Sequence, residues 1–214
     1  MKLFFVNNNK NKLILFLTGW GCDEKQFQRL VSIDYDVLIG YDYSNLDIDF
    51  DFSKYKEIYL LTFSAGVFVA GLISDRLPLF AKKIAINGNP LSYDKYYGLQ
   101  ENIIEKFKAI SKNNIVDFRK EYLVFSDEEL KLLNSLQPHR SIESCIKELI
   151  ALKKYYMTSF EPMKFDTVYL SDNDKILEFN RQKEYFANDN IKVIKNAGHF
   201  PFFRFNTYDE IIKG

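Results

Sequence analysis

Short apolar runs, most of them continuous and separated by helix-favouring segments, are the feature that most restricts how this chain can fold. Such runs occur at residues 3–6, 13–17, 37–39, 58–61, 84–86, 168–170 and 193–194. A run that is apolar at consecutive positions is typical of a strand buried on both faces of a sheet. Helical patterns lie between several of the runs, at residues 24–31, 65–75, 176–186 and 208–213. Strands that alternate with helices predict an α/β fold with a mainly parallel, doubly wound sheet.

Residues 91–160 interrupt this alternation. No strong strand pattern occurs there, and several helix-favouring segments follow one another. These segments include residues 102–111 and 141–156. Ser126 and Ser141 each precede acidic residues, in the arrangement that caps the N-terminus of a helix. We therefore expect a core formed by residues 1–90 and 161–214, with a helical cap inserted between its two parts.

The composition fits a single globular domain without a general attraction to polyanions. Of the 214 residues, 47% are hydrophobic and 27% are charged, which provides enough apolar surface for a sizeable core. Lysine and arginine together number 29, as do aspartate and glutamate, so no overall field favours nucleic acid or an anionic membrane. We expect neither of these partners.

The N-terminus and the cysteines favour a cytoplasmic protein. The apolar run at residues 3–6 stops far short of the hydrophobic region of a secretory signal. No apolar stretch approaches the roughly 18 to 20 residues that would span a bilayer. Cys22 and Cys145 are too few for a disulfide framework, so we expect two free thiols.

A serine lies at the junction between a predicted strand and a predicted helix. The segment Thr62-Phe63-Ser64-Ala65-Gly66 follows the apolar run at residues 58–61. In a nucleophile elbow, a strand, a tight turn and a helix present the serine Oγ at the carboxyl edge of the sheet. The usual pattern is G-x-S-x-G, and Thr62 replaces its first glycine, so the threonine side chain needs space in the local packing. The alternative reading is that Ser64 caps the helix that begins at Ala65.

A glycine-containing loop after an early strand offers a second element of such a site. The apolar run at residues 13–17 is followed by Thr18-Gly19-Trp20-Gly21. The backbone N–H groups of Trp20 and Ala65 are candidates to form an oxyanion hole, and such donors contribute several kcal/mol to transition-state stabilisation. The alternative is an ordinary tight turn.

The general base and its carboxylate partner are expected late in the chain. Of the two histidines, His199 follows the last predicted strand, whereas His139 lies in the predicted cap. Imidazole is the ordinary base for a serine hydroxyl. Asp174, with Asp172 as the alternative, follows the penultimate strand and would hold the imidazole in the useful tautomer. The order Ser64, Asp174, His199 is the order expected of the α/β-hydrolase fold.

Several short motifs of the chain resemble those of one group of enzymes. The motifs are Thr18-Gly19-Trp20-Gly21, Tyr41-Asp42-Tyr43, Phe63-Ser64-Ala65-Gly66-Val67 and Gly198-His199-Phe200-Pro201-Phe202. The sequence is similar over most of its length to the BioG-type pimeloyl-acyl-carrier-protein methyl ester esterases of biotin synthesis, which are α/β-hydrolases. The resemblance implies hydrolysis of a carrier-bound pimeloyl methyl ester, with release of methanol. The triad chemistry requires neither a metal nor an organic cofactor.

Such a substrate requires an apolar channel and a cationic surface for an acidic carrier protein. Trp20, Phe200, Phe202 and Tyr41 are candidates to line the channel, although the aromatic residues are equally candidates for the core. The candidate cations in the predicted cap are Arg119, Lys120, Arg140, Lys147, Lys153 and Lys154. Each of them can also be explained as part of a solvated helix face.

Two other functions are compatible with the same residues. A triad of this kind also serves carboxylesterases and thioesterases that act on small acyl substrates, because a fold does not select a substrate. A catalytically silent hydrolase-fold protein that binds a partner through its cap is the alternative from a different class.

Overall fold

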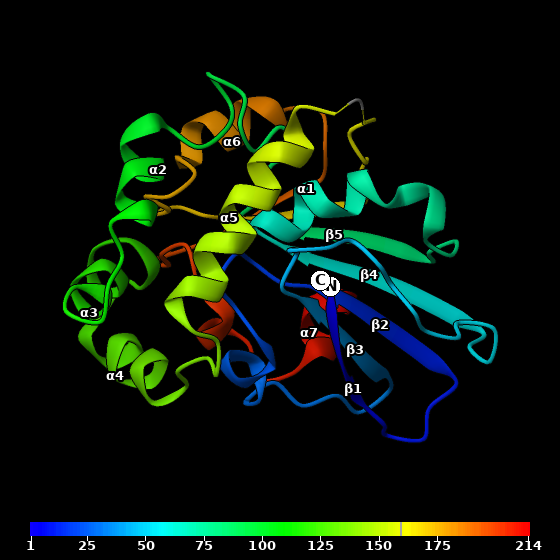
Figure 1. Cartoon of the computed structure of the whole chain (residues 1–214). Helices are drawn as coiled ribbons and strands as arrows, with labels where there is room; N and C mark the ends of the chain where they lie inside the picture. The colour runs from blue at the N-terminus through cyan, green and yellow to red at the C-terminus, as the bar shows by residue number, and fades with distance from the viewer. Residues whose placement is uncertain (159) are drawn as a thin grey trace.

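A computed structural model of the chain describes residues 1–158 and 160–214 and has a seven-stranded sheet at its centre (Figure 1). The strand order is β1-β3-β2-β4-β5-β6-β7. The strands are β1 (Lys2–Val6), β2 (Lys12–Leu17), β3 (Asp36–Tyr41), β4 (Glu57–Phe63), β5 (Lys82–Ile86), β6 (Thr167–Ser171) and β7 (Ile191–Ile194). β1 pairs with β3 in the antiparallel direction, and the other pairings are parallel. The prediction of a mainly parallel α/β sheet is confirmed.

The central strands show why the apolar runs are continuous. Every residue of β2 after Lys12 is buried, and so is every residue of β6. Successive side chains of a strand point to opposite faces of the sheet. Accordingly, Ile14 and Phe16 belong to one hydrophobic core, while Leu13, Leu15 and Leu17 belong to the other. A strand with a core on each face has no position at which a polar side chain would reach water.

The helices of the core are α1 (Ala65–Leu72), α6 (Phe179–Tyr185) and α7 (Tyr208–Lys213), with short 3-10 turns η1 (Glu24–Phe27), η2 (Ser74–Arg76) and η4 (Pro201–Arg204). The helix predicted at residues 24–31 is shorter than expected. A capping box of Asp23 and Gln26 begins η1. The chain then becomes extended, because Val31 forms a parallel bridge to Thr207 that a continued helix would prevent.

Helices α2 (Glu101–Lys108), α3 (Ile115–Phe118), α4 (Asp127–Ser135) and α5 (Ile142–Tyr156), together with the π-helical turn η3 (Arg119–Leu123), follow β5. Figure 1 shows them in green to yellow beside the sheet. Ser126 and Ser141 cap α4 and α5 by accepting from the N–H groups of Glu129 and Ser144. All of these helices fall within residues 91–160, the segment that we propose as a cap. In the described part of the chain, no helix has the length and apolar character needed to cross a membrane.

Candidate active site

Ser64 stands in the sharp turn between β4 and α1. Its backbone has φ 52° and ψ −118°, a conformation that is strained for a residue other than glycine. Its N–H donates to the carbonyl of Ile86 at 3.0 Å, which ties the turn to β5. The Ser64 side chain makes no capping hydrogen bond to α1. Capping therefore does not account for this serine, whose hydroxyl is available for another partner.

Close backbone packing supports this turn on both sides. A Cβ on Gly66 would lie 2.1 Å from the carbonyl oxygen of Leu17, so only glycine allows α1 to approach β2 this closely. A Cβ on Gly88 would lie 2.7 Å from the carbonyl oxygen of Ser64. Thr62, in place of the usual first glycine, is fully buried and donates its hydroxyl to the carbonyl of Ile84 at 2.9 Å. The packing thus has space for the threonine and satisfies its polar atom.

Ser64, His199 and Asp174 form one hydrogen-bonded series. His199 Nε2 lies 2.9 Å from Ser64 Oγ, and His199 Nδ1 lies 2.8 Å from Asp174 Oδ2. Both distances are within hydrogen-bond reach for a nucleophile, a base and an orienting acid. Asp172 pairs instead with Lys195 at 3.7 Å. His139 is exposed, and its imidazole lies 3.6 Å from Glu24.

The Asp174 carboxylate is fixed by further donors. Its Oδ1 accepts from the backbone N–H groups of Ile176 and Leu177, at 2.8 and 3.0 Å. Its Oδ2 also accepts from Gln182 Nε2 at 3.2 Å, and Gln182 is fully buried. These donors fix the carboxylate in its position facing the imidazole. The sequence carried no signal for Gln182, because its partner lies eight residues away outside any motif.

Asn87 is a second residue that the sequence reasoning missed. It follows β5 in a left-handed conformation, with φ 42°, and is fully buried. Its Nδ2 donates to the carbonyl of His199 at 2.9 Å and to Ser171 Oγ at 2.7 Å, while its Oδ1 accepts from the Ser171 N–H at 2.8 Å. Asn87 therefore ties the histidine loop to β6. The sequence feature that could have pointed to Asn87 is an asparagine directly after a strand, because asparagine tolerates the left-handed backbone conformation.

The two candidate oxyanion donors, Trp20 and Ala65, belong to segments that lie next to the serine. Among the hydrogen bonds of the described residues, neither the Trp20 N–H nor the Ala65 N–H has a protein acceptor. The Trp20 side chain is fixed, because its Nε1 donates to the carbonyl of Cys145 at 2.7 Å and its ring stacks on Phe107 at 4.5 Å. A Cβ on Gly19 would lie 3.2 Å from the Ser64 Cβ, so the loop runs close to the serine.

A cavity of about 360 Å³ reaches from Ser64 and His199 into the cap. Of the four candidates for the substrate channel, Trp20 and Phe200 line this cavity. Phe202 and Tyr41 do not. Phe202 is buried against other aromatic rings of the core, including Phe16 at 5.6 Å. Tyr41 lies beside Glu24 instead, where burial and the Glu24 carboxylate raise the pKa of its phenol to about 12.

The further apolar lining comes mainly from the cap helices and from the loop before α6. It includes Leu99, Phe107, Ile110, Ile115, Phe118, Leu149, Leu152, Ile176 and Leu177. A mostly apolar cavity with a few polar groups at one place is the usual form of a small-molecule site.

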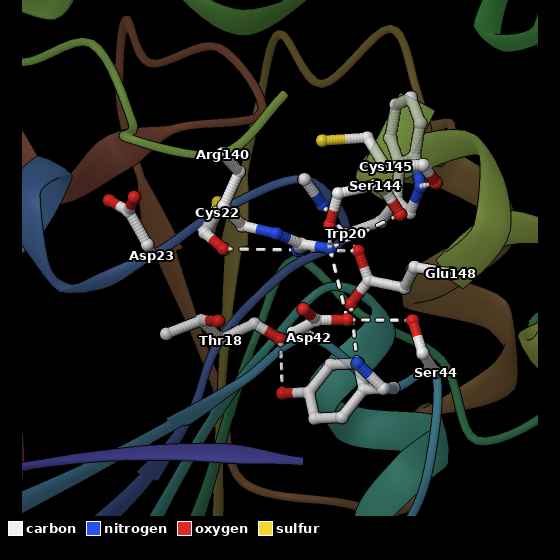
Figure 2. A network of polar contacts seen from close by, with 12 residues as sticks. Thr18, Trp20, Cys22, Asp23, Asp42, Ser44, Arg140, Ser144, Cys145 and Glu148 are labelled. Carbon is white, nitrogen blue, oxygen red and sulfur yellow. Dashed lines mark hydrogen bonds and ion pairs between the residues drawn. The ribbon is translucent and has the colours of Figure 1, made fainter. Parts of the chain in front are cut away.

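Two of the predicted surface cations are buried, which corrects the sequence reasoning. Arg119 is 5% exposed and donates to Asn134 Oδ1 at 2.9 Å. The Arg140 side chain is 3% exposed and lies 2.7 Å from Glu148 and 3.2 Å from Asp42 (Figure 2). Long charged side chains are seldom buried unless they are paired, so the sequence favoured a surface position. Neither arginine is accessible to a docked protein.

The other predicted cations are exposed. Lys120 pairs with Asp127 at 3.0 Å across the surface. Lys147, Lys153 and Lys154 lie on the exposed part of α5. These lysines remain available to a partner.

Both cysteines are free thiols, as predicted. Burial raises the pKa of the Cys22 thiol far above its ordinary value. Burial also raises the pKa of Cys145, to about 11. Because the thiolate is the reactive form of cysteine, burial disfavours both groups as a second nucleophile at neutral pH.

The strand order, the strained serine after β4, the aspartate after β6 and the histidine after β7 define an α/β-hydrolase. The solved structure of MenH from S. aureus shares this fold, with a TM-score of 0.62 and 16% identity over 99% of this chain and 94% of that one. The family model described as pimeloyl-ACP methyl esterase BioG matches residues 1–211. The chain therefore belongs to the BioG family.

Individual relatives agree with this membership. The crystal structure of BioG from Haemophilus influenzae superposes with a TM-score of 0.88, at 26% identity over 99% of this chain and 100% of that chain. A Bacteroides fragilis protein named malonyl-[acyl-carrier protein] O-methyltransferase is 29% identical over 181 residues, or 82% of this chain. The matched region is only 36% of that protein's length. Family and fold together support an ester-hydrolysing enzyme.

Proposed function

We propose that this protein hydrolyses the methyl ester of a pimeloyl chain carried on an acyl-carrier protein, with Ser64 as nucleophile, His199 as base and Asp174 as the orienting acid. The observation that supports the chemistry is the unbroken series Ser64 Oγ, His199 Nε2, His199 Nδ1 and Asp174 Oδ2, at 2.9 and 2.8 Å. Membership in the BioG family supports the substrate.

In the proposed mechanism, His199 Nε2 takes the Ser64 proton while Oγ attacks the ester carbonyl. The N–H groups of Trp20 and Ala65 bind the oxyanion of the tetrahedral intermediate. Its collapse releases methanol, which takes its proton from His199. A water molecule then gives a proton to His199 and attacks the acyl-enzyme. The bond to Ser64 Oγ breaks, Oγ takes that proton back from His199, and the carboxylate is freed. Asp174 accepts from the Nδ1–H throughout and stabilises the imidazolium.

The cavity and the surface suit a carrier-bound acyl chain. The apolar lining beyond Ser64 fits a chain of methylene groups. Exposed Lys120, Lys147 and Lys154 on the cap would orient an acidic carrier protein, because rim charges mainly steer encounter. The B. fragilis relative is named for methylation of a carrier-bound malonyl group, and our proposed reaction removes a methyl ester from a carrier-bound chain.

The test is mass-spectrometric turnover of pimeloyl-carrier-protein methyl ester by the wild type and by Ser64→Ala. The expected product has lost the methyl ester but retains the thioester to the carrier. Ser53→Ala, at an exposed position, is the matched control and is expected to behave as the wild type. Turnover of a short aryl ester alone would instead favour a general carboxylesterase, and loss of the thioester would favour a thioesterase. Failure of a serine-directed phosphonate to label Ser64 would favour a catalytically silent protein.

A further inference from the structure

Helix α5 of the cap contacts the loop that carries the proposed oxyanion donor Trp20. The Trp20 indole N–H donates to the carbonyl of Cys145 at 2.7 Å. The next residue, Gly21, donates its backbone N–H to Glu148 Oε2 at 3.0 Å. Gly21 has φ 72°, so the loop turns sharply at this point. The side chain of Trp20 and the peptide that follows it are therefore both bonded to the cap, next to the peptide that carries the proposed donor.

Glu148 uses its two carboxylate oxygens for two different segments of the core. Oε2 accepts from Gly21, and Oε1 accepts from the backbone N–H of Tyr43 at 2.9 Å. The Tyr43 hydroxyl in turn donates to the carbonyl of Thr18 at 2.8 Å, at the start of the same loop. The Glu148 side chain has no exposure to solvent. A glutamine could not replace it, because its single oxygen would serve one N–H while its amide nitrogen would face the other.

Arg140 supplies the countercharge and a further contact with the loop (Figure 2). Its Nη1 donates to Glu148 Oε2 at 2.7 Å and to the carbonyl of Cys22 at 3.3 Å. Its Nη2 lies 3.2 Å from Asp42, which Lys2 approaches from the outside at 3.1 Å. Two cations and two carboxylates thus alternate from the interior to the surface. A buried charge with its partners in place has few alternative positions, since separation would leave it unpaired.

We propose that Glu148, with Arg140 as its counterion, is a positioning residue for ester hydrolysis. It holds the segment from Trp20 to Cys22 so that the Trp20 N–H points at the oxyanion. Preorganised donors of this kind act because they need no rearrangement during the reaction. The inference rests on the proposed function of Ser64, and it makes α5 part of the catalytic apparatus as well as a cover for the cavity.

The test compares E148Q with the wild type on a neutral aryl ester, p-nitrophenyl butyrate. We expect kcat to fall on the order of 10- to 100-fold, as for a misplaced oxyanion donor. KM is expected to stay within about twofold, because the cavity lining is unchanged.

Inhibition by a trifluoromethyl ketone of the same chain length provides a second measurement. Ser64 Oγ adds to the ketone carbonyl, and the resulting oxyanion occupies the position of the oxyanion in the tetrahedral intermediate. The inhibition constant of the ketone should rise by the factor by which kcat/KM falls. E101Q, an exposed glutamate of α2, is the matched control and should leave all three values unchanged.

A second variant keeps the test decisive if E148Q does not fold. The double variant R140M/E148Q removes both buried charges together, which proteins tolerate far better than the loss of one partner. It still lacks the carboxylate, so the same loss of kcat is expected. In the wild type, NMR hydrogen exchange of the Gly21 amide should be strongly retarded.

Three results would overturn the inference. They are a folded variant with kcat within about twofold of the wild type, an unchanged inhibition constant for the ketone, and a Gly21 amide that exchanges at the rate of an unprotected peptide. Failure of the proposed function is distinguishable, because the wild type would then be inactive or Ser64→Ala would be as active as the wild type.

Discussion

Thr62 shows how a departure from a motif at one residue can leave the local geometry intact. Its hydroxyl donates to Ile84 and its side chain is fully buried. We expect Thr62→Val to lose about 1–2 kcal/mol of stability, since the shape is kept while a buried carbonyl loses a donor. Urea denaturation would measure the loss, with Thr62→Ser as the control that keeps the hydroxyl. The kcat of Thr62→Val should match the wild type, and a large fall in kcat would show that the elbow depends on this bond.

The cysteines give a prediction with a pH dependence. Burial raises the pKa of Cys145 from its ordinary 9.0 to about 11. At pH 8 the thiolate fraction is then lower by a factor of about 100, and iodoacetamide should alkylate the native thiol more slowly by about that factor. The rate should rise about tenfold for each pH unit between 8 and 10. Free cysteine is the control. Fast labelling of Cys145 at pH 8 by peptide mass spectrometry would contradict the prediction.

At the residue scale, the sequence predicted three candidate groups beside strand ends, and the structure brings these three residues into hydrogen-bond contact. Ser64, Asp174 and His199 each follow an apolar run, so chain order alone brings them to one edge of the sheet. Asn87 and Glu148 were missed because their contacts join segments far apart in the chain. Glu148 also lies in a helix where other charged residues face water, and nothing local marks it as buried.

At the scale of elements, the approach of α1 to β2 determines where the serine stands. A Cβ on Gly66 would lie 2.1 Å from a backbone oxygen of β2, whereas one on Gly71, in the same helix, would lie 3.1 Å from the carbonyl of Glu161. We expect Gly66→Ala to lose at least about 3 kcal/mol, because at 2.1 Å the added Cβ overlaps the backbone of β2, which would have to move as a whole. Gly71→Ala should stay within about 1 kcal/mol and keep its activity, because the helix propensity of alanine offsets a mild contact. Thermal unfolding and aryl ester turnover of both variants would test this contrast. Equal losses in the two variants would show that the distance to β2 is not the cause.

The helices and strands that the sequence predicted best are those whose apolar pattern fits only one kind of secondary structure. Inner strands such as β2 and β6, and the buried α1, follow from continuous apolar runs that need cover on both faces, whereas the edge strands β1 and β7 are only partly buried. The extent of η1 did not follow from the sequence, because the bridge between Val31 and Thr207 joins segments far apart in the chain. The division of residues 102–156 into separate helices depends on turns such as η3, for which no strong sequence signal exists.

At the scale of the whole molecule, overall neutrality has a consequence for how a charged partner would be recognised. The chain carries 29 cationic and 29 anionic side chains, so attraction to an acidic carrier has to arise from local groups. Lys147 and Lys154 lie seven residues apart on α5 and therefore share a helix face. In the described residues neither lysine forms an ion pair. Glu148, which follows Lys147, lies on the buried part of the same helix. In our proposal, the helix that would meet the carrier therefore also positions the oxyanion loop.

This arrangement predicts that salt lowers kcat/KM for a carrier-bound substrate but not for a small aryl ester. Raising the ionic strength from about 0.05 to 0.5 M shortens the Debye length to a few ångströms, so steering by exposed lysines should be lost. We expect kcat/KM for the carrier-bound methyl ester to fall several-fold over this range, while kcat/KM for p-nitrophenyl butyrate changes little. Lys147→Glu should lower kcat/KM for the carrier substrate at low salt and leave the aryl ester unaffected. Lys56→Glu, at an exposed position outside the cap, is the matched control. Equal salt dependence for both substrates would contradict steering by exposed charges, and an unchanged kcat/KM in Lys147→Glu would place carrier recognition elsewhere than on α5.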